Sequence, residues 1–164
     1  MLSTIVGMEL RQRALQVLCL SDVDQKVAQT LHMQTQAASF SIADKAPDEP
    51  LDLPGRPERP ALLAHSQVAR RSPATPAGRA VLLHAIAHIE FNAINLALDA
   101  VWRFSGMPQR YYLDWLRIAA EEAQHFCLLR EHLRSQGHDY GDFPAHQGLW
   151  TMCEKTRGDV VARM

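Results

Sequence analysis

At 164 residues the chain is long enough for one domain with a sizeable core, and its 47% hydrophobic content is ordinary for a globular protein. A net charge of −1 gives no sign of a nucleic-acid partner, and no apolar run approaches the length of a membrane span. The N-terminus lacks the features of a signal peptide. Cys19, Cys127 and Cys153 form no C-x-x-C motif, so we expect a cytoplasmic protein with reduced thiols.

Two short helices are predicted in the N-terminal segment, residues 1–42. Apolar residues recur at helical spacing over residues 9–20 and again over residues 23–38. Ser21 or Asp22 is suited to cap the second helix, because a short polar side chain accepts hydrogen bonds from the first free backbone N–H groups.

Residues 43–78 form a proline-rich segment. Seven of the nine prolines fall between Pro47 and Pro76, which excludes helix over most of it. Two interpretations remain open: a linker, or an extended segment that lies on a helical bundle and buries its aliphatic side chains. We favour the second. The side chains available for this burial are Leu51, Leu53, Leu62, Leu63 and Val68.

A long amphipathic helix is predicted over residues 82–104. One stripe along it is polar and consists of His84, His88, Asn92, Asn95 and Asp99. Glu90 lies roughly opposite that stripe, among apolar neighbours, so we expect it to face the core. Because a buried carboxylate must be paired, protonated or bound to a metal ion, Glu90 either bonds a buried Tyr or Arg or is a metal ligand.

A second long helix is predicted over residues 109–135. Glu122 and His125 lie within its apolar stripe, whereas Glu121 falls on the polar side. Side chains at positions i and i+3 lie together and can chelate one ion. The three candidate ligands should therefore be much less exposed than Glu121 and the histidines of the polar stripe.

The connection between these helices contains Gly106 and Pro108, typical of a helix end followed by a new start. So short a connection makes the helices antiparallel neighbours. Glu90 precedes Gly106 by 16 residues and Glu122 follows it by 16, so both lie about 24 Å from the turn. The sequence therefore predicts a metal site formed by Glu90, Glu122 and His125.

A third helix of the bundle is predicted after this hairpin. Asp142 is placed to cap it, with Pro144 in its first turn. Trp150 and Cys153 then give it an apolar face. With the hairpin, this helix makes residues 79–164 an all-α partial bundle.

Three runs resemble one family of ferritin-like proteins, catalogued as a domain of unknown function in many bacteria. They are HAIAHIEFNAINLALDAVWRF, YYLDWLRIAAEEAQHFCLLREHL and YGDFPAHQGLW. The resemblance implies a ferritin-like helical bundle with Glu90, Glu122 and His125 at ligand positions. Its more distant relatives include rubrerythrin-like proteins and a tRNA-modifying di-iron hydroxylase.

Members of that family continue further and supply a second Glu and a second Glu-x-x-His. In this chain no other Glu is followed at the third position by His. The chain thus resembles the N-terminal part of the family pattern, with an incomplete bundle and half of a di-metal site. Two copies in a homodimer would restore the full ligand count.

Carboxylate and imidazole ligands together suit iron, manganese or zinc. The complete site would suit the oxidation of a small-molecule substrate, with O₂ or peroxide as the oxidant. Glu90 and Glu122 would be terminal and bridging carboxylates and His125 a nitrogen donor, with Asp99 or Glu121 orienting them. The alternatives are metal storage without turnover and a structural fragment of a longer ferritin-like protein.

Overall fold

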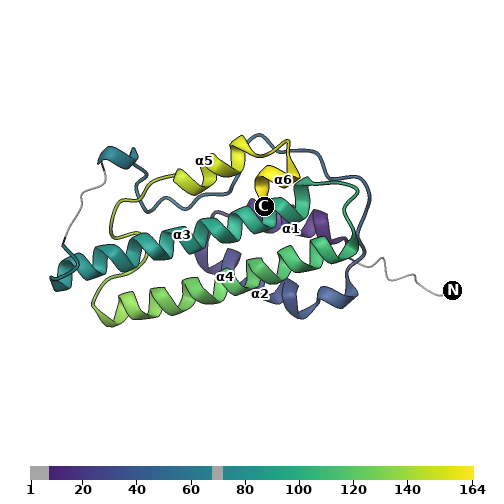
Figure 1. The fold of residues 1–164 in the computed structure, drawn as a ribbon. Helices are drawn as coiled ribbons and strands as arrows, with labels where there is room; N and C mark the ends of the chain where they lie inside the picture. Colours follow the sequence, from purple (N-terminus) through teal and green to yellow (C-terminus); the bar gives the residue numbers. More distant parts are fainter. Residues whose placement is uncertain (1–7, 68–71) are drawn as a thin grey trace.

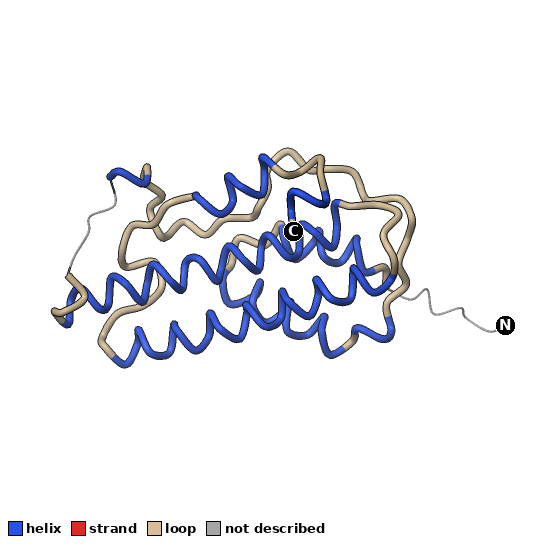
Figure 2. The backbone as a smooth tube through the Cα atoms, in the orientation of Figure 1, coloured by secondary structure: helices blue, strands red, loops and turns tan. Residues whose placement is uncertain are grey.

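The computed structural model describes residues 8–67 and 72–164, and within them it is all-helical (Figures 1 and 2). The described part contains no strand, only two isolated bridges between loop segments. The all-α prediction is therefore confirmed. The elements in chain order are α1 (Leu10–Leu18), α2 (Val23–Thr35), η1 (Ala37–Ser39), η2 (His65–Gln67), α3 (Pro76–Arg103), α4 (Gln109–Ser135), α5 (Gly148–Lys155) and α6 (Val160–Arg163).

The antiparallel pair α3 and α4 runs the length of the molecule (Figure 1). Gly106 makes the turn with a φ of 69°, a conformation that favours glycine. Tyr112 locks the turn, since its hydroxyl donates to the Phe104 carbonyl at 2.8 Å and accepts from the Met107 N–H at 3.2 Å. The second predicted helix, residues 109–135, coincides with α4.

The first long helix starts earlier than predicted, at Pro76 instead of residue 82. Thr75 is its N-cap, and the Thr75 hydroxyl accepts from the Gly78 N–H at 3.0 Å. Proline is well tolerated at the first helical position, where its missing N–H would have no partner. The proline that indicated an extended segment is therefore the first residue of α3.

The N-terminal helices α1 and α2 pack against α3 and α4. Asp22 is the N-cap of α2, with its carboxylate accepting from the Gln25 N–H at 2.7 Å. Arg11 of α1 is fully buried and donates two hydrogen bonds to the Trp102 carbonyl at the end of α3. These contacts make the N-terminal helices part of the same core as the hairpin.

The proline-rich residues 43–64, called the strap below, lie along the helices as extended chain (Figure 2). Trp102 donates from its indole N–H to the Pro47 carbonyl at 3.0 Å. Further along, the Gly55 N–H donates to the Leu18 carbonyl at 2.9 Å. The backbone of the strap is therefore hydrogen-bonded to the side chain of Trp102 on α3 and to the backbone of α1 at Leu18.

The strap buries fewer aliphatic side chains than expected. Leu53 packs against the core and Leu62 is half-buried. The expected burial is wrong for Leu51 and Leu63, which are exposed. Val68 lies outside the described residues. Pro54 and Pro60 are buried instead. The strap therefore packs against the helices through these prolines and not through Leu51 and Leu63.

The predicted helix with Trp150 and Cys153 on its apolar face is confirmed as α5, in which both side chains are buried. Its predicted start and cap are wrong, and a second short helix, α6, follows it. Asp142 caps neither of them and accepts instead from the Asp139 N–H at 2.7 Å. The first, α5, begins only at Gly148. The second, α6, is capped by Asp159, whose carboxylate accepts from the Val161 N–H at 2.8 Å.

The polar stripe of α3, predicted to be the more exposed side, is buried and forms what we call the closed face. His84 and Asp99 are 0% exposed, and no member exceeds 9%. The strap, α5 and the loop after α4 cover this side of the helix (Figure 1). The closed face consists of His84, His88, Asn92, Asn95 and Asp99.

By length and composition α3 is apolar enough to cross a membrane, which differs from the expectation that no apolar run approaches that length. The core helix of a soluble protein passes the same test. In the structure α3 packs against α1, α4 and α5, and its apolar composition therefore has an explanation within this fold.

Candidate metal centre

Glu90 of α3 meets Glu122 and His125 of α4 at one point along the hairpin. One ligand atom from each lies within 4.8 Å of the other two. His125 Nδ1 is 3.0 Å from Glu122 Oε2 and 4.0 Å from Glu90 Oε2. The predicted convergence is confirmed, and it follows from the equal spacing of the two glutamates from the turn.

Exposure of the three side chains differs from the prediction. The side chains of Glu90 and Glu122 are 21% and 24% exposed, less than the 48% of Glu121. His125, however, is 56% exposed, more than Glu121, and His84 and His88 are buried. The expected order therefore holds only for the two carboxylates against Glu121, and it is wrong for His125 and for both histidines of the closed face. The reason is packing: His125 lies toward the outer side of α4, which no described element covers.

The two carboxyl groups interact directly. Burial, a hydrogen bond with Glu122 and the charge of Glu122 raise the pKa of Glu90 to about 7, against a small opposing effect of His125. Burial also acts on Glu122, but the hydrogen bonds from Glu90 and His125 outweigh it and lower the pKa of Glu122. Near neutral pH the pair therefore shares a proton, which a bound cation would displace.

The donor set fits a first-row divalent metal ion. Two ligands that are each about 2.1 Å from one ion are at most about 4.2 Å apart. The 3.0 Å and 4.0 Å separations from His125 to the two carboxylates lie within that limit. Two carboxylates and one imidazole leave further coordination positions free, because octahedral ions take six ligands.

Exposed apolar side chains occur on both helices near the three donors in the sequence. Ile89 precedes Glu90 and is 48% exposed, as is Leu82 two turns earlier. Leu128, one turn after His125, is 65% exposed. We call the side of the hairpin that carries the three donors and these exposed side chains the open face.

The residues expected to orient the ligands are engaged elsewhere. Asp99 is bound by Arg103 and Arg163 on the closed face. Glu121 forms an ion pair with Arg117 at 2.7 Å, one turn away on the polar side of α4. Neither carboxylate is a partner of the three donors, and that part of the prediction is wrong.

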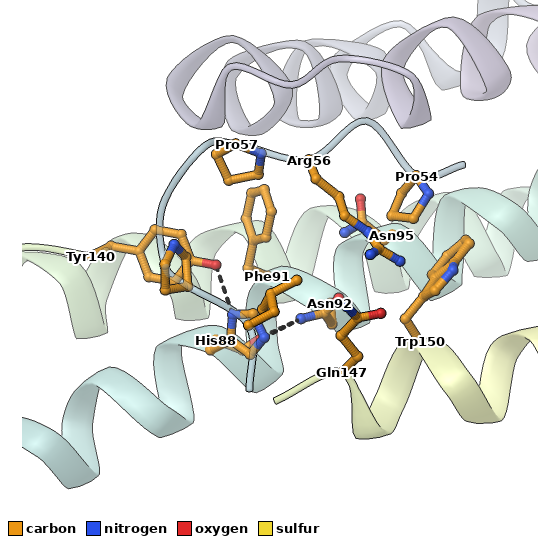
Figure 3. A pocket seen from close by; sticks show the side chains of 12 residues that line it. Pro54, Arg56, Pro57, His88, Phe91, Asn92, Asn95, Tyr140, Gln147 and Trp150 are labelled. Atoms are coloured by element: carbon orange, nitrogen blue, oxygen red, sulfur yellow. Dashed lines mark hydrogen bonds between the residues drawn. The ribbon is translucent and has the colours of Figure 1, made fainter. Parts of the chain in front are cut away.

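A second cluster of polar side chains surrounds a cavity on the closed face (Figure 3). His88 lies within hydrogen-bond distance of the Tyr140 hydroxyl at 2.9 Å and of the Asn92 amide at 3.0 Å. Lys26 of α2 donates to Asn95 at 2.7 Å. Helical spacing predicts the polar stripe of α3 but not its burial. The available signal was that α3 is apolar on its remaining sides, which is typical of a helix covered all round.

Comparison with models of known protein families finds a match for most of this chain. The model of a family described as a protein of unknown function, DUF455, matches residues 19–164. A protein of Haemophilus influenzae, named there only as uncharacterized, is 53% identical over 115 residues, which is 66% of this chain. The match spans 40% of that relative's length. No solved structure matches the chain.

Proposed function

The chain belongs to the DUF455 family, and we propose that it is a ferritin-like protein carrying half of a di-metal carboxylate centre. The observation that carries this proposal is the convergence of Glu90, Glu122 and His125 from two antiparallel helices, with one ligand atom each within 4.8 Å. A Glu on one helix and a Glu-x-x-His on its neighbour make up half of the ligand set of di-iron bundle proteins.

Each residue has a role in that centre. Glu122 is hydrogen-bonded to Glu90 and lies 3.0 Å from His125, which suits a bridging carboxylate. Glu90 would be a terminal carboxylate ligand and His125 a nitrogen donor. Iron fits this donor set, as do manganese and zinc. Iron, once bound, would supply oxidation chemistry with O₂ or peroxide, which makes an oxidoreductase acting on a small molecule the favoured activity.

The missing half of the centre must come from outside the described hairpin. A second copy related by a two-fold axis would bring another Glu90, Glu122 and His125 to the same place. The exposed apolar side chains of Ile89 and Leu128, which are near the donors in the sequence, favour such pairing. Because the two copies would also bring four carboxylates together, their association should depend on a divalent cation.

Metal binding without turnover is the second candidate. The observation that favours it is the 56% exposure of His125, because oxidative chemistry normally needs a site that excludes water. An open site of this kind is suited to taking up and releasing a metal ion.

The experiment is a titration of metal-free protein with Fe²⁺ under anaerobic conditions, with mass measured under native conditions. We expect weak binding by the monomer and two ions per dimer. Glu122→Ala should abolish that binding. Glu121→Ala is the matched control and should retain most of it, because Glu121 is paired with Arg117. A monomer that holds two ions tightly, or equal losses in both variants, would contradict the proposal.

A further inference from the structure

Tyr140 differs from the other tyrosines in the partner of its hydroxyl. The sequence contains three tyrosines, and the structure describes all of them. The hydroxyls of Tyr111 and Tyr112 donate to backbone carbonyls, at 3.5 Å and 2.8 Å. The Tyr140 hydroxyl instead lies 2.9 Å from Nδ1 of His88 (Figure 3). An imidazole can take up the proton of a phenol, whereas a backbone carbonyl is far too weak a base to do so.

The contacts of His88 place the shared proton on the tyrosine. Nε2 of this imidazole lies 3.2 Å from the His146 carbonyl, which can only accept, so Nε2 carries the ring proton. The Asn92 amide lies 3.0 Å from the same nitrogen, and it already donates to the His88 carbonyl at 2.9 Å. Nδ1 is then the unprotonated nitrogen and accepts from the Tyr140 hydroxyl. The phenol keeps its proton, because burial raises the pKa of Tyr140.

Two phenylalanine rings connect Tyr140 with the region of the metal donors. The centroid of the Tyr140 ring lies 5.0 Å from that of Phe126 and 5.4 Å from that of Phe91, and these two lie 5.4 Å apart. Phe126 is one helical turn after Glu122, about 6 Å along α4, and Phe91 directly follows Glu90. All three rings are buried. A continuous set of packed aromatic side chains therefore leads from the neighbourhood of the donors to Tyr140.

On the basis of the metal centre proposed above, we propose that Tyr140 is a redox-active residue that stores one oxidising equivalent for this centre, with His88 as its proton acceptor. Tyr140 loses one electron to the metal centre once O₂ or peroxide has oxidised that centre. The O–H bond of the phenol breaks and its proton passes to Nδ1 of His88, which leaves a neutral phenoxyl radical and an imidazolium. A one-electron donor, either the substrate or a soluble reductant, then restores the phenol as the proton returns.

Burial makes Tyr140 better suited than the open centre to hold an oxidising equivalent. His125 is 56% exposed, and an oxidant at an exposed site is open to side reactions with solvent and solutes. Tyr140 and His88 are 9% and 8% exposed. The free space beside them is about 30 Å³, which has room for water but not for a larger reductant. A radical on Tyr140 is therefore shielded from quenching.

The first test uses electron paramagnetic resonance on the iron-loaded chain. Protein loaded with Fe²⁺ under anaerobic conditions is mixed with O₂ and frozen at intervals, and bound iron is counted in the same samples. We expect a tyrosyl radical signal that narrows when the tyrosine rings are deuterated. Tyr140→Phe should abolish this signal. Tyr111→Phe is the matched control and should retain most of it, because the Tyr111 hydroxyl has no base as its partner.

A second test needs no metal. In the presence of EDTA, a ruthenium tris-bipyridine complex that is photo-oxidised by a flash withdraws single electrons from the protein. We expect the radical that persists after the flash to be lost in Tyr140→Phe and kept in Tyr111→Phe. His88→Gln removes the base and keeps a polar side chain, so the folded variant should lose the persistent radical in both tests.

The outcomes separate this proposal from that of the metal centre. Iron that binds and is oxidised without a radical, or a signal unchanged in Tyr140→Phe, would refute the redox role of Tyr140. So would ¹⁵N chemical shifts that place the ring proton of His88 on Nδ1. Protein that binds no iron would contradict the metal centre and the storage role with it, while the flash experiment still decides whether Tyr140 and His88 form a redox-active pair. If His88→Gln does not fold, the two tyrosine variants decide alone.

Discussion

On the open face of α3, Glu90 lies 21% exposed beside Glu122 and His125, and Leu82 and Ile89 of the same helix are exposed as well. On the closed face of the same helix, His84 and Asp99 are 0% exposed under other parts of the chain. Charged groups on the closed face are mostly bonded, as in the pairing of Asp99 with two arginines. The carboxylates of the open face have only each other and one imidazole.

The polar side chains of α3 therefore serve two different purposes on its two faces. On the closed face, buried polar atoms are satisfied by partners from distant parts of the chain, and this fixes how the covering segments dock. On the open face the donors converge without a compensating cation, which is typical of a site prepared for a ligand. Substitutions on the two faces should therefore have different consequences.

The largest expected effect comes from Asp99→Ala. Asp99 pairs with Arg163, whose side chain is 1% exposed, and with Arg103. Removing one partner of a buried pair leaves an uncompensated charge, so the free energy of unfolding should fall by about 3–5 kcal/mol. Urea denaturation of the variant and the parent chain measures this difference in the free energy of unfolding.

The matched control is Glu49→Ala, which removes the exposed partner of Arg103. A 45% exposed carboxylate contributes little, and the loss should stay below about 1 kcal/mol. Similar losses in both variants would show that the closed face is not a distinct buried network.

A smaller effect is expected from Gly55→Ala in the strap. A Cβ there would lie 2.1 Å from the Cys19 carbonyl oxygen, so the strap must move away from the helices beneath it. We expect the free energy of unfolding to fall by about 1–3 kcal/mol, measured by urea denaturation. Gly158→Ala, where nothing lies within 4 Å, should change it by less than about 1 kcal/mol. A neutral Gly55→Ala would mean that the strap does not hold the closed face shut.

The smallest effect concerns pH and the open face. The pKa of Glu90 is raised to about 7 in the fold, so the native state holds a proton that the unfolded chain releases above its own, lower pKa. In metal-free protein this stabilisation is fully present below the unfolded pKa and is lost as pH rises toward 7, on the order of 1 kcal/mol.

Comparing Glu90→Gln with the parent chain isolates this contribution. The difference in free energy of unfolding between the two should change between about pH 4.5 and 7 and stay constant above that range. Chemical denaturation at a series of pH values, with a chelator present, makes the measurement. A pH-independent difference would mean that the two carboxyl groups do not share a proton.

Much of the hairpin was predictable, because its causes are local. Helical spacing of apolar residues predicted both long helices, and Gly106 and Pro108 predicted the turn between them. Equal distances along the chain then placed Glu90 level with Glu122, since the rise per residue is the same in both helices. The separation of Glu121 from Glu122 also follows from helix geometry alone.

The errors arise where burial depends on distant segments. Whether the polar stripe of α3 faces water or protein is decided by the strap and α5, and nothing within the stripe itself distinguishes the two. His125 was expected inside because its stripe is apolar, yet it is exposed because no described element packs there. The sequence predicts Asp142 as a helix cap, but the chain continues as a loop to Gly148 before α5 begins.

By itself the sequence determined the helical hairpin and the three side chains that converge on it, because periodicity and distance from a turn are properties of consecutive residues. Only the tertiary structure decided which side of α3 is closed, how Lys26 comes to lie beside Asn95, and which donors remain exposed. Those outcomes depend on contacts between residues far apart in the chain, such as the 2.7 Å bond from Lys26 to Asn95. Such contacts form when the free energy gained from burial and hydrogen bonding over the whole molecule exceeds the cost in chain entropy.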